Sequence, residues 1–307
     1  MNALNRPDGD GPPLRPPLQG VEVSVVMVVY RTGPALAESL RRVLAGDEVG
    51  EFVLVDNGSA TDEAAVMTAV EADARVTVLR GHGNVGFARG ANLGAAAAHG
   101  RVLVFLNPDA FLEDGCIAAL KAALDPARSP CLVGARMMNT DGTEQRGGRR
   151  GEVTPASALL SLTKLAGRLP GLKRFEIHHQ DEAVPSGPVA TPTVSGACFA
   201  MTRTDFTALG GFDEGYFLHV EDIDLCWRVR RAGGTVLFQP QARVLHLGST
   251  ARRAPLLIEL NKGFGLARFF RKRADTAGQK VAALVLTPVI LAVSVARAGL
   301  RRRPARD

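Results

Sequence analysis

Two acidic segments, far apart in the sequence, carry the side chains best suited to chemistry. Residues 106–110 read Leu-Asn-Pro-Asp-Ala, and residues 219–225 read His-Val-Glu-Asp-Ile-Asp-Leu. The first follows an apolar run and the second opens a helical pattern, so we expect their carboxylates to lie at the ends of elements. Carboxylates in such places can hold a divalent cation or accept a proton. Together they indicate an enzyme that acts on a charged, oxygen-rich substrate.

The second segment crowds Glu221, Asp222 and Asp224 into the first turn of a predicted helix. The positive end of the helix dipole stabilises negative charge there, which accounts for one or two acids but not for three. Carboxylates this close together repel one another, so one of them tends to hold a proton more tightly and can act as a general base. All three are candidate catalytic residues.

Asp109 and His246 are candidate ligands for a divalent cation. Mg²⁺ and Mn²⁺ take several oxygen ligands and often combine one or two carboxylates with substrate phosphates, so a diphosphate substrate would complete the shell around Asp109. The alternative is an exposed acid in a proline-containing turn. His246 follows an apolar pair and precedes Gly248-Ser249, which predicts a turn at the edge of a site. The other five histidines lack such a context and are expected at the surface.

These side chains must be positioned by an alternation of short apolar runs and helix-length segments. The runs are Val23–Tyr30, Phe52–Val55, Val76–Leu79, Val102–Leu106 and Leu132–Ala135, and the helical segments are Pro34–Ala45, Thr61–Asp73, Phe87–Ala98 and Gly115–Leu124. Strands that are apolar on both faces and separated by helices predict an α/β fold with a mostly parallel sheet covered on both sides. Ligands of such sheets bind outside the carboxyl ends of the strands.

Polar residues follow four of the predicted strands. They lie at residues 30–32, 56–59, 83–86 and 107–109, and all four groups should converge on one edge of the sheet. Asp56 could accept hydrogen bonds from a base or ribose, although the sequence Asp-Asn-Gly-Ser also favours a turn or a helix cap. Residues 81–86 match G-x-G-x-x-G, which favours an NAD-dependent oxidoreductase when taken alone. That motif follows the third strand rather than the first, and its glycines would serve equally well beside any bound nucleotide.

The composition suits a cytosolic protein without disulfides. The chain has 307 residues, of which 46% are hydrophobic, and its four cysteines are scattered singly, as expected of small buried side chains in a reducing compartment. Residues 1–20 contain five prolines and lack the apolar core of a secretion signal, so they are expected to form a disordered lead.

The net charge of +6 is concentrated in the tail. Residues 252–307 contain 13 Lys and Arg against 3 Asp and Glu, which leaves a net charge of −4 on residues 1–251. This distribution argues against a nucleic-acid partner for the main domain and indicates an anionic surface near the C-terminus.

The second half is less regular. Residues 139–193 form a predicted irregular insertion with a weak helix at 156–165, followed by a strand at 194–201, a turn at 210–213, a helix at 221–232 and short strands near Val236 and Val244. The tail, residues 251–307, predicts an amphipathic basic helix and then an uncharged stretch, Val281–Ala296, which contains Pro288. Sixteen residues are short for the roughly twenty that a bilayer requires, so we expect a peripheral or shallow membrane anchor.

In combination, the motifs resemble those of the family 2 glycosyltransferases, especially the rhamnosyltransferase-like branch. The segments that carry the resemblance are Val25–Tyr30, Val55–Ser59, Asn84–Ala88, Leu106–Asp109, Gly210–Glu214 and Glu221–Leu225, and their order and spacing match over roughly residues 22–250. The resemblance implies a GT-A nucleotide-sugar-binding domain over residues 21–250 and inverting transfer of one sugar to a hydroxyl. The insertion at 139–193 would then lie on the acceptor side.

The resemblance also implies roles for single residues. The donor nucleotide would be bound by Tyr30, Thr32, Asp56, Asn57, Asn84, Gly86 and Asn107. Asp109, assisted by His246, would hold Mg²⁺ or Mn²⁺ on the donor diphosphate, and Asp222 would be the base, with Glu221 and Asp224 as alternatives. The metal motif of the family is often Asp-x-Asp, whereas this chain has Asn107 in the first place, as is common in this branch.

The expected function is therefore metal-dependent transfer of a sugar, rhamnose from dTDP-rhamnose, to a glycan or polyprenyl-linked acceptor in the synthesis of a surface polysaccharide. The expected location is the cytoplasm, at the inner face of the membrane. The alternatives are the oxidoreductase and a catalytically silent nucleotide-sugar-binding protein.

Overall fold

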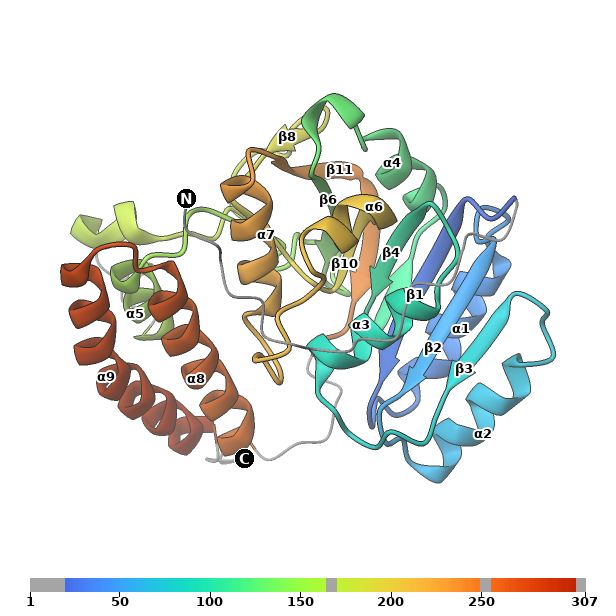
Figure 1. Cartoon of the computed structure of the whole chain (residues 1–307), viewed down its shortest axis with the longest axis horizontal. Helices are drawn as coiled ribbons and strands as arrows, with labels where there is room; N and C mark the ends of the chain where they lie inside the picture. The colour runs from blue at the N-terminus through green and yellow to red at the C-terminus, as the bar shows by residue number, and fades with distance from the viewer. Residues whose placement is uncertain (1–19, 164–169, 249–254, 302–307) are drawn as a thin grey trace, which may run out of the picture.

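The computed structural model describes residues 20–163, 170–248 and 255–301. An α/β domain is followed by two long C-terminal helices that lie side by side (Figure 1). The lead predicted to be disordered falls outside the described residues, apart from Gly20.

Nine of the strands in the described residues form one central sheet. Across the sheet they are β3 (Val76–Leu79), β2 (Glu51–Asp56), β1 (Val23–Val29), β4 (Val102–Leu106), β10 (Cys198–Thr202), β6 (Cys131–Met138), β11 (Thr235–His246) and β5 (Ala110–Leu112), with β8 (Val189–Ala190) also paired to β11. Only β10, β5 and β8 run against the direction of the others, so the predicted mostly parallel sheet is confirmed. A small second sheet pairs β7 (Arg149–Arg150) with β9 (Thr193–Val194).

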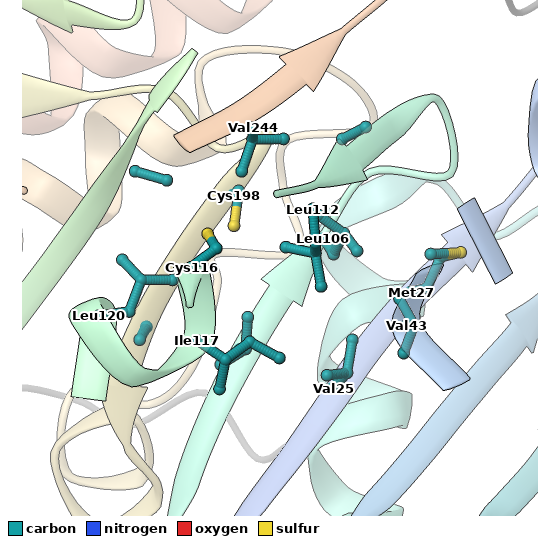
Figure 2. Packing of buried hydrophobic residues seen from close by; sticks show 14 of the residues in the cluster. Val25, Met27, Val43, Leu106, Leu112, Cys116, Ile117, Leu120, Cys198 and Val244 are labelled. Carbon is teal, nitrogen blue, oxygen red and sulfur yellow. The ribbon is translucent and has the colours of Figure 1, made fainter. Parts of the chain in front are cut away.

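Helices cover both faces of the sheet. One face packs against α1 (Ala35–Ala45), α2 (Thr61–Val70) and α4 (Cys116–Ala122), and the other packs against α3 (Phe87–Ala97), α6 (Arg203–Ala208) and α7 (Glu221–Arg231). All seven residues of β1 are buried, because successive side chains point to opposite faces and both faces are covered. Figure 2 shows Val25 and Met27 of β1 in the first of these cores, together with Ile117 of α4.

All four cysteines are buried and free. The thiols of Cys116 and Cys198 face each other within the core drawn in Figure 2. Burial raises the pKa of Cys226 to about 12, so this thiol stays neutral and behaves as a small apolar side chain.

A cluster of phenylalanines fixes the turn that leads toward α7. Phe212 makes edge contacts with Phe105 and Phe199 at ring distances of 5.3 and 6.0 Å. Asn92 of α3 holds the same residue through both its backbone N–H and its carbonyl, each at 2.9 Å. Gly211 has φ +68, and a Cβ there would lie 2.6 Å from the Asn92 Oδ1 atom, so the close approach requires glycine. The predicted turn at 210–213 thus ties the start of the α7 region to α3.

The C-terminal helices are α8 (Pro255–Arg273) and α9 (Ala277–Arg301), and α9 also packs against α5 (Pro155–Thr163). The remaining short helices are the 3-10 turns η1 (Pro126–Arg128) and η2 (Pro170–Phe175). Helix α8 packs on the domain through Leu266, Phe269 and Phe270, which form a third core with Tyr216 and Val220. We call α8 and α9 together the C-terminal hairpin.

The structure differs from the sequence predictions in several places. The strand expected at 194–201 is two strands, β9 and β10, which belong to different sheets, and helix α6 was not predicted. The two short strands expected near Val236 and Val244 are one strand, β11, with an irregularity in its pairing between Gln239 and Arg243. The three-residue strand β5 was not predicted. Helix α9 continues through Pro288 to Arg301, so the apolar helix is longer than the uncharged stretch seen in the sequence.

Candidate active site

A cavity of about 620 Å³ opens at the carboxyl ends of the parallel strands. Eight of the predicted site residues line it: Tyr30, Thr32, Asn57, Asn107, Asp109, Glu221, Asp222 and His246. They come from the ends of β1, β2, β4 and β11 and from the start of α7. Strand β10 runs the other way, so the residues before it, Ser195 to Ala197, reach the same cavity. The carboxylates Asp109 and Asp222, 113 positions apart in the sequence, therefore face one space.

Two asparagines organise the part of the site where the donor nucleotide is predicted to bind. The Asn57 amide donates to the Gly86 carbonyl at 3.0 Å and to the Asn84 side chain at 3.2 Å, while its oxygen accepts the Val85 N–H at 3.0 Å. These bonds join the loop after β2 to the loop before α3. Asn84 and Gly86 do not line the cavity themselves, but they hold Asn57, which does.

Asp56 and Gly86 have local structural contacts as well. One Asp56 oxygen accepts the N–H groups of Gly58 and Ser59 at 3.1 and 2.8 Å, which is the turn that the sequence offered as an alternative. Gly86 has φ +87, and a Cβ there would lie 2.6 Å from the Phe217 carbonyl oxygen. The glycine thus allows the chain before α7 to pack closely against the start of α3.

Asp109 and His246 meet in the same cavity, where β4 and β11 end. Asp109 is 6% exposed, and its Oδ1 lies 3.3 Å from the Nε2 atom of His246. The antiparallel pairing of β5 with β11 places Ala110 opposite His246, and the Leu247 N–H donates to the Asp109 carbonyl at 3.1 Å. The short strand that sequence reasoning missed therefore sets the position of this pair.

Asp222 is held by three donors. Its Oδ2 accepts from Arg150 at 2.6 Å and from the Gly196 N–H at 3.1 Å, and its Oδ1 accepts from the Ile223 N–H at 2.8 Å. A Cβ on Gly196 would lie 2.9 Å from the Asp222 Cβ, so glycine is needed for this contact. The carboxylate is fixed in one orientation toward the cavity.

The backbone just before Asp222 is strained. His219 and Val220 have φ values of +69 and +76, a region that costs about 1–3 kcal/mol per non-glycine residue. Helix α8 packs on this turn: a Cβ on Gly265 would lie 2.9 Å from a methyl carbon of Val220. The packing of the C-terminal hairpin thus supports the conformation that starts α7.

Glu221 is a buried acid. It is 7% exposed, and its Oε2 has no hydrogen-bond partner within the described part of the chain. Burial, together with the nearby charge of Asp222, raises the pKa of Glu221 to about 8. At neutral pH the side chain is therefore a neutral carboxylic acid that can donate a hydrogen bond into the cavity.

We expect Glu221→Gln to remove part of the pH dependence of stability. In the folded chain the pKa is about 8, against a usual value of 4.5, so the stability that the neutral acid contributes is full below pH 4.5 and is lost as the pH rises through about 8. Glutamine stays neutral, so the drop in melting temperature between about pH 5 and pH 9 should shrink in the variant. Glu214→Gln, on an exposed acid, is the control. Equal drops in Glu221→Gln and the wild type would contradict a raised pKa.

Asp224, the third predicted acid, does not line the cavity. It is fully buried and paired with Arg228 at 2.7 Å and with Lys272 of α8 at 2.8 Å, and it accepts from the Tyr216 hydroxyl at 3.2 Å. In the structure this residue joins α7 to α8.

Several cavity residues were missed by sequence reasoning. They are Gln145, Arg146, Arg150 and His178 from the insertion, His219 before α7, and Ile258 and Lys262 from α8. The prediction of surface positions was wrong for His178 and His219, which line the cavity, and for His99, which is largely buried and pairs with Glu51 at 2.6 Å. Burial, with the charges of Arg146 and Arg150, lowers the pKa of His178 to about 4, so its ring is neutral. Of these missed residues, only His219 could have been suspected from the sequence, because it lies two positions before Glu221 in the acidic segment.

The donor set at Asp109 and His246 fits a divalent cation. A carboxylate oxygen and a ring nitrogen converge at the cavity edge, with Asn107 on the same wall. The described residues contain no cluster of three or more His, Cys, Asp or Glu side chains arranged to hold a metal ion. The protein would therefore supply two ligands, and the oxygens of a diphosphate and water would supply the rest.

Comparison with solved structures identifies the fold. A mannosyltransferase from Pyrobaculum calidifontis, solved with GDP-mannose and Mn²⁺, is similar at a TM-score of 0.56 and 17% identity, over 95% of this chain and 79% of that one. GalNAc-T7, solved with UDP, GalNAc and Mn²⁺, is similar at 0.56 and 21%, over 74% of this chain and 44% of that one. The fold is that of the GT-A glycosyltransferases.

The family follows from the sequence match. Residues 24–209, more than half of the chain, match the model of glycosyl transferase family 2. The chain belongs to this family, and the resemblance drawn from its motifs is confirmed.

Two curated relatives illustrate the range of the family. An N-acetylglucosaminyl-diphospho-decaprenol L-rhamnosyltransferase of Mycobacterium tuberculosis is 27% identical over 234 residues, which are 72% of this chain and 75% of that protein. The O-antigen biosynthesis protein RfbC of Myxococcus xanthus is 26% identical over 83% of this chain, but the match spans only 20% of that much longer protein. The chain is thus a family 2 glycosyltransferase with relatives in glycan and polysaccharide synthesis.

Proposed function

We propose that this protein transfers rhamnose from dTDP-rhamnose, with inversion, to a hydroxyl of a lipid-linked glycan acceptor. The observation that carries the proposal is that the Asp109–His246 pair and the Asp222 carboxylate face one cavity. The Asp109–His246 pair suits a donor diphosphate, and the Asp222 carboxylate suits an attacking alcohol. The rhamnosyltransferase of Mycobacterium tuberculosis supports the choice of sugar and of a lipid-linked acceptor.

The transfer would be a single displacement. Asp222 takes the proton of the acceptor hydroxyl as that oxygen bonds to the anomeric carbon, and the bond from this carbon to the diphosphate oxygen breaks. Arg150 and the Gly196 N–H keep the carboxylate aimed at the incoming oxygen. The departing nucleoside diphosphate takes up negative charge, which a divalent cation held by Asp109 and His246 would neutralise when bound. No enzyme nucleophile is required.

The donor is tested by thermal melting and turnover. We expect dTDP-rhamnose with Mn²⁺ to raise the melting temperature more than UDP, GDP or NAD with Mn²⁺, because only a ligand of the folded state stabilises it. Release of dTDP in the presence of a polyprenyl-diphosphate-linked sugar should follow. Stabilisation by NAD alone would contradict the proposal, and binding of dTDP-rhamnose without turnover on any acceptor would indicate a catalytically silent protein.

We further propose that the C-terminal hairpin lies on the inner face of the cell membrane. One helix in the described residues, α9, is long and apolar enough to cross a bilayer by length and composition. Its exposed side carries Val281, Leu284, Val285, Val289 and Val295, which are 45–65% exposed. Its other side packs on α8 through Ala283 and Ile290, so only one face is open to lipid. A helix whose other side is covered by a second helix suits shallow insertion at the membrane surface rather than a span.

Helix α8 links this surface to the cavity. Leu257 and Phe264 of α8 are 55% and 56% exposed, whereas Ile258 and Lys262 of the same helix line the cavity. Residues seven apart share a helix face, and Ile258 and Lys262 lie on another. Ala267 and Phe270 of the same helix are buried against the domain. An acceptor with a membrane-embedded tail could reach the cavity along this helix.

The membrane surface is tested on the exposed stripe of α9. Each large apolar side chain contributes about 1.5–3 kcal/mol when fully buried, so Leu284→Glu combined with Val285→Glu should lower binding to anionic phospholipid vesicles by more than about tenfold. Vesicle sedimentation measures the bound fraction. Val184→Glu, on an exposed valine before β8, is the matched control and should bind normally. Unchanged sedimentation of the double variant would place the membrane contact elsewhere.

A further inference from the structure

The side chain of Gln145, in the insertion after β6, is held in one orientation. Its Nε2 donates to the His246 carbonyl at 2.9 Å and to the Asn139 Oδ1 at 3.2 Å. The Asn139 amide is itself oriented, because its nitrogen donates to the Thr143 hydroxyl at 2.9 Å. A backbone carbonyl can only accept a hydrogen bond, so the nitrogen of Gln145 must face it. The Gln145 oxygen must then face the other way.

That oxygen lies 2.6 Å from the Nδ1 atom of His246. An amide oxygen has no hydrogen to donate, so the hydrogen of this bond belongs to Nδ1. In a neutral imidazole only one nitrogen carries hydrogen, and the hydrogen bond of one nitrogen fixes the state of the other. Gln145 therefore selects the tautomer in which Nε2 presents a lone pair.

In the neutral ring, the lone pair of Nε2 faces a second acceptor, because the Asp109 Oδ1 lies 3.3 Å away. Two acceptors that face each other repel unless a positive centre, a proton or a metal ion, lies between them. A histidine ligand of a metal ion commonly donates its other ring N–H to an oxygen, which orients the ring and raises its basicity. The Gln145–His246–Asp109 arrangement has this pattern, and its outer member comes from the insertion.

We propose that Gln145 is a positioning residue that fixes His246 in the Nδ1–H tautomer and so prepares its Nε2 as a ligand of the divalent cation that accompanies the donor. The proposal rests on the metal role that the proposed function gives to Asp109 and His246. It gives the insertion a part in donor binding in addition to its expected place on the acceptor side. Gln145 would act only through His246, without touching the cation or the sugar.

The test compares two substitutions in the whole chain. Gln145→Met keeps the length of the side chain but removes the acceptor for Nδ1–H, whereas Gln145→Glu keeps that acceptor and loses only the donor to the His246 carbonyl and to Asn139. With saturating dTDP, we expect Gln145→Met to weaken Mn²⁺ binding by about 10–100-fold, measured as free Mn²⁺ by electron paramagnetic resonance, and Gln145→Glu to weaken it less. Gln241→Met, which removes a bond to the Ser186 carbonyl outside the cavity, is the control and should bind as the wild type does.

A second readout does not need the metal. Nitrogen-15 NMR of labelled histidine should show His246 of the metal-free wild type with hydrogen on Nδ1, and a shift toward the Nε2–H form in Gln145→Met. Wild-type Mn²⁺ affinity in Gln145→Met, or a neutral wild-type ring with its hydrogen on Nε2 rather than on Nδ1, would overturn the role of Gln145 alone. Failure of the wild type to bind Mn²⁺ at all would overturn the metal role of Asp109 and His246 with it.

Discussion

Replacing Asp222 by Asn is expected to lower the rate of sugar transfer by about 10²–10⁴-fold, the usual contribution of a general base. Asparagine has nearly the same shape and keeps an oxygen for the Gly196 N–H, but it cannot take a proton from the acceptor. The donor is proposed to bind at the Asp109 side of the cavity, so its affinity should stay unchanged. Steady-state kinetics with saturating acceptor gives the rate, and calorimetric titration with the donor gives the affinity.

Neighbouring acids provide the controls for this result. Glu221→Gln should keep most of the activity at neutral pH, because the raised pKa already makes Glu221 neutral there. Asp224→Asn should lower the melting temperature, since it weakens the buried pairs with Arg228 and Lys272. If Asp222→Asn were fully active while Glu221→Gln was inactive, the base would be Glu221 and the assignment to Asp222 would be wrong.

Replacing Asp109 by Ala is expected to abolish the gain in donor affinity that Mn²⁺ provides. Only Asp109 and His246 are proposed as protein ligands, so the loss of the carboxylate leaves one neutral nitrogen to hold a doubly charged ion beside a diphosphate. We expect the affinity for dTDP in the presence of Mn²⁺ to fall on the order of 100-fold. The measurement is a thermal melt with dTDP, with and without Mn²⁺.

The appropriate control for the metal site is Asp62→Ala, on an exposed acid of α2 that does not line the cavity. It should retain the full Mn²⁺-dependent stabilisation. A wild type that binds dTDP equally well with a chelator, together with an Asp109→Ala variant that behaves in the same way, would show that donor binding does not use a metal.

The sheet could be predicted where local pattern decides the structure. The runs that became β1, β2 and β4 are apolar on both faces, and this pattern has few alternatives in a chain with intervening helices. Strand β5 has three residues, too few for any periodicity, and forms only because β11 pairs with it from more than 130 positions away. Pro240 and the glutamines beside it interrupt the apolar pattern of β11, and the structure accommodates them as an irregularity of the pairing.

The residues of the candidate site could likewise be predicted only where they stand in local motifs. Asp109, Asp222 and His246 stand in recognisable motifs at the ends of elements, so sequence reasoning found them. Arg150 and Gln145 reach their partners across 72 and 101 positions from a segment without regular pattern. Such a long-range contact forms only when the whole chain folds, so a single sequence gives no local signal for it. Likewise, which side of α9 is exposed depends on how it packs against α8, and the sequence of α9 alone does not show this.

The close approach of Gly265 to Val220 has a practical consequence for truncation experiments. A shortened protein that ends before α8 would uncover Tyr216, Val220 and Ile223 to water and leave Asp224 without Lys272. Its loss of activity would then report collapse of the α7 start rather than release from lipid. The hairpin therefore supports the site in addition to its proposed contact with the membrane, and the two roles can be separated only by single changes on its outer surface.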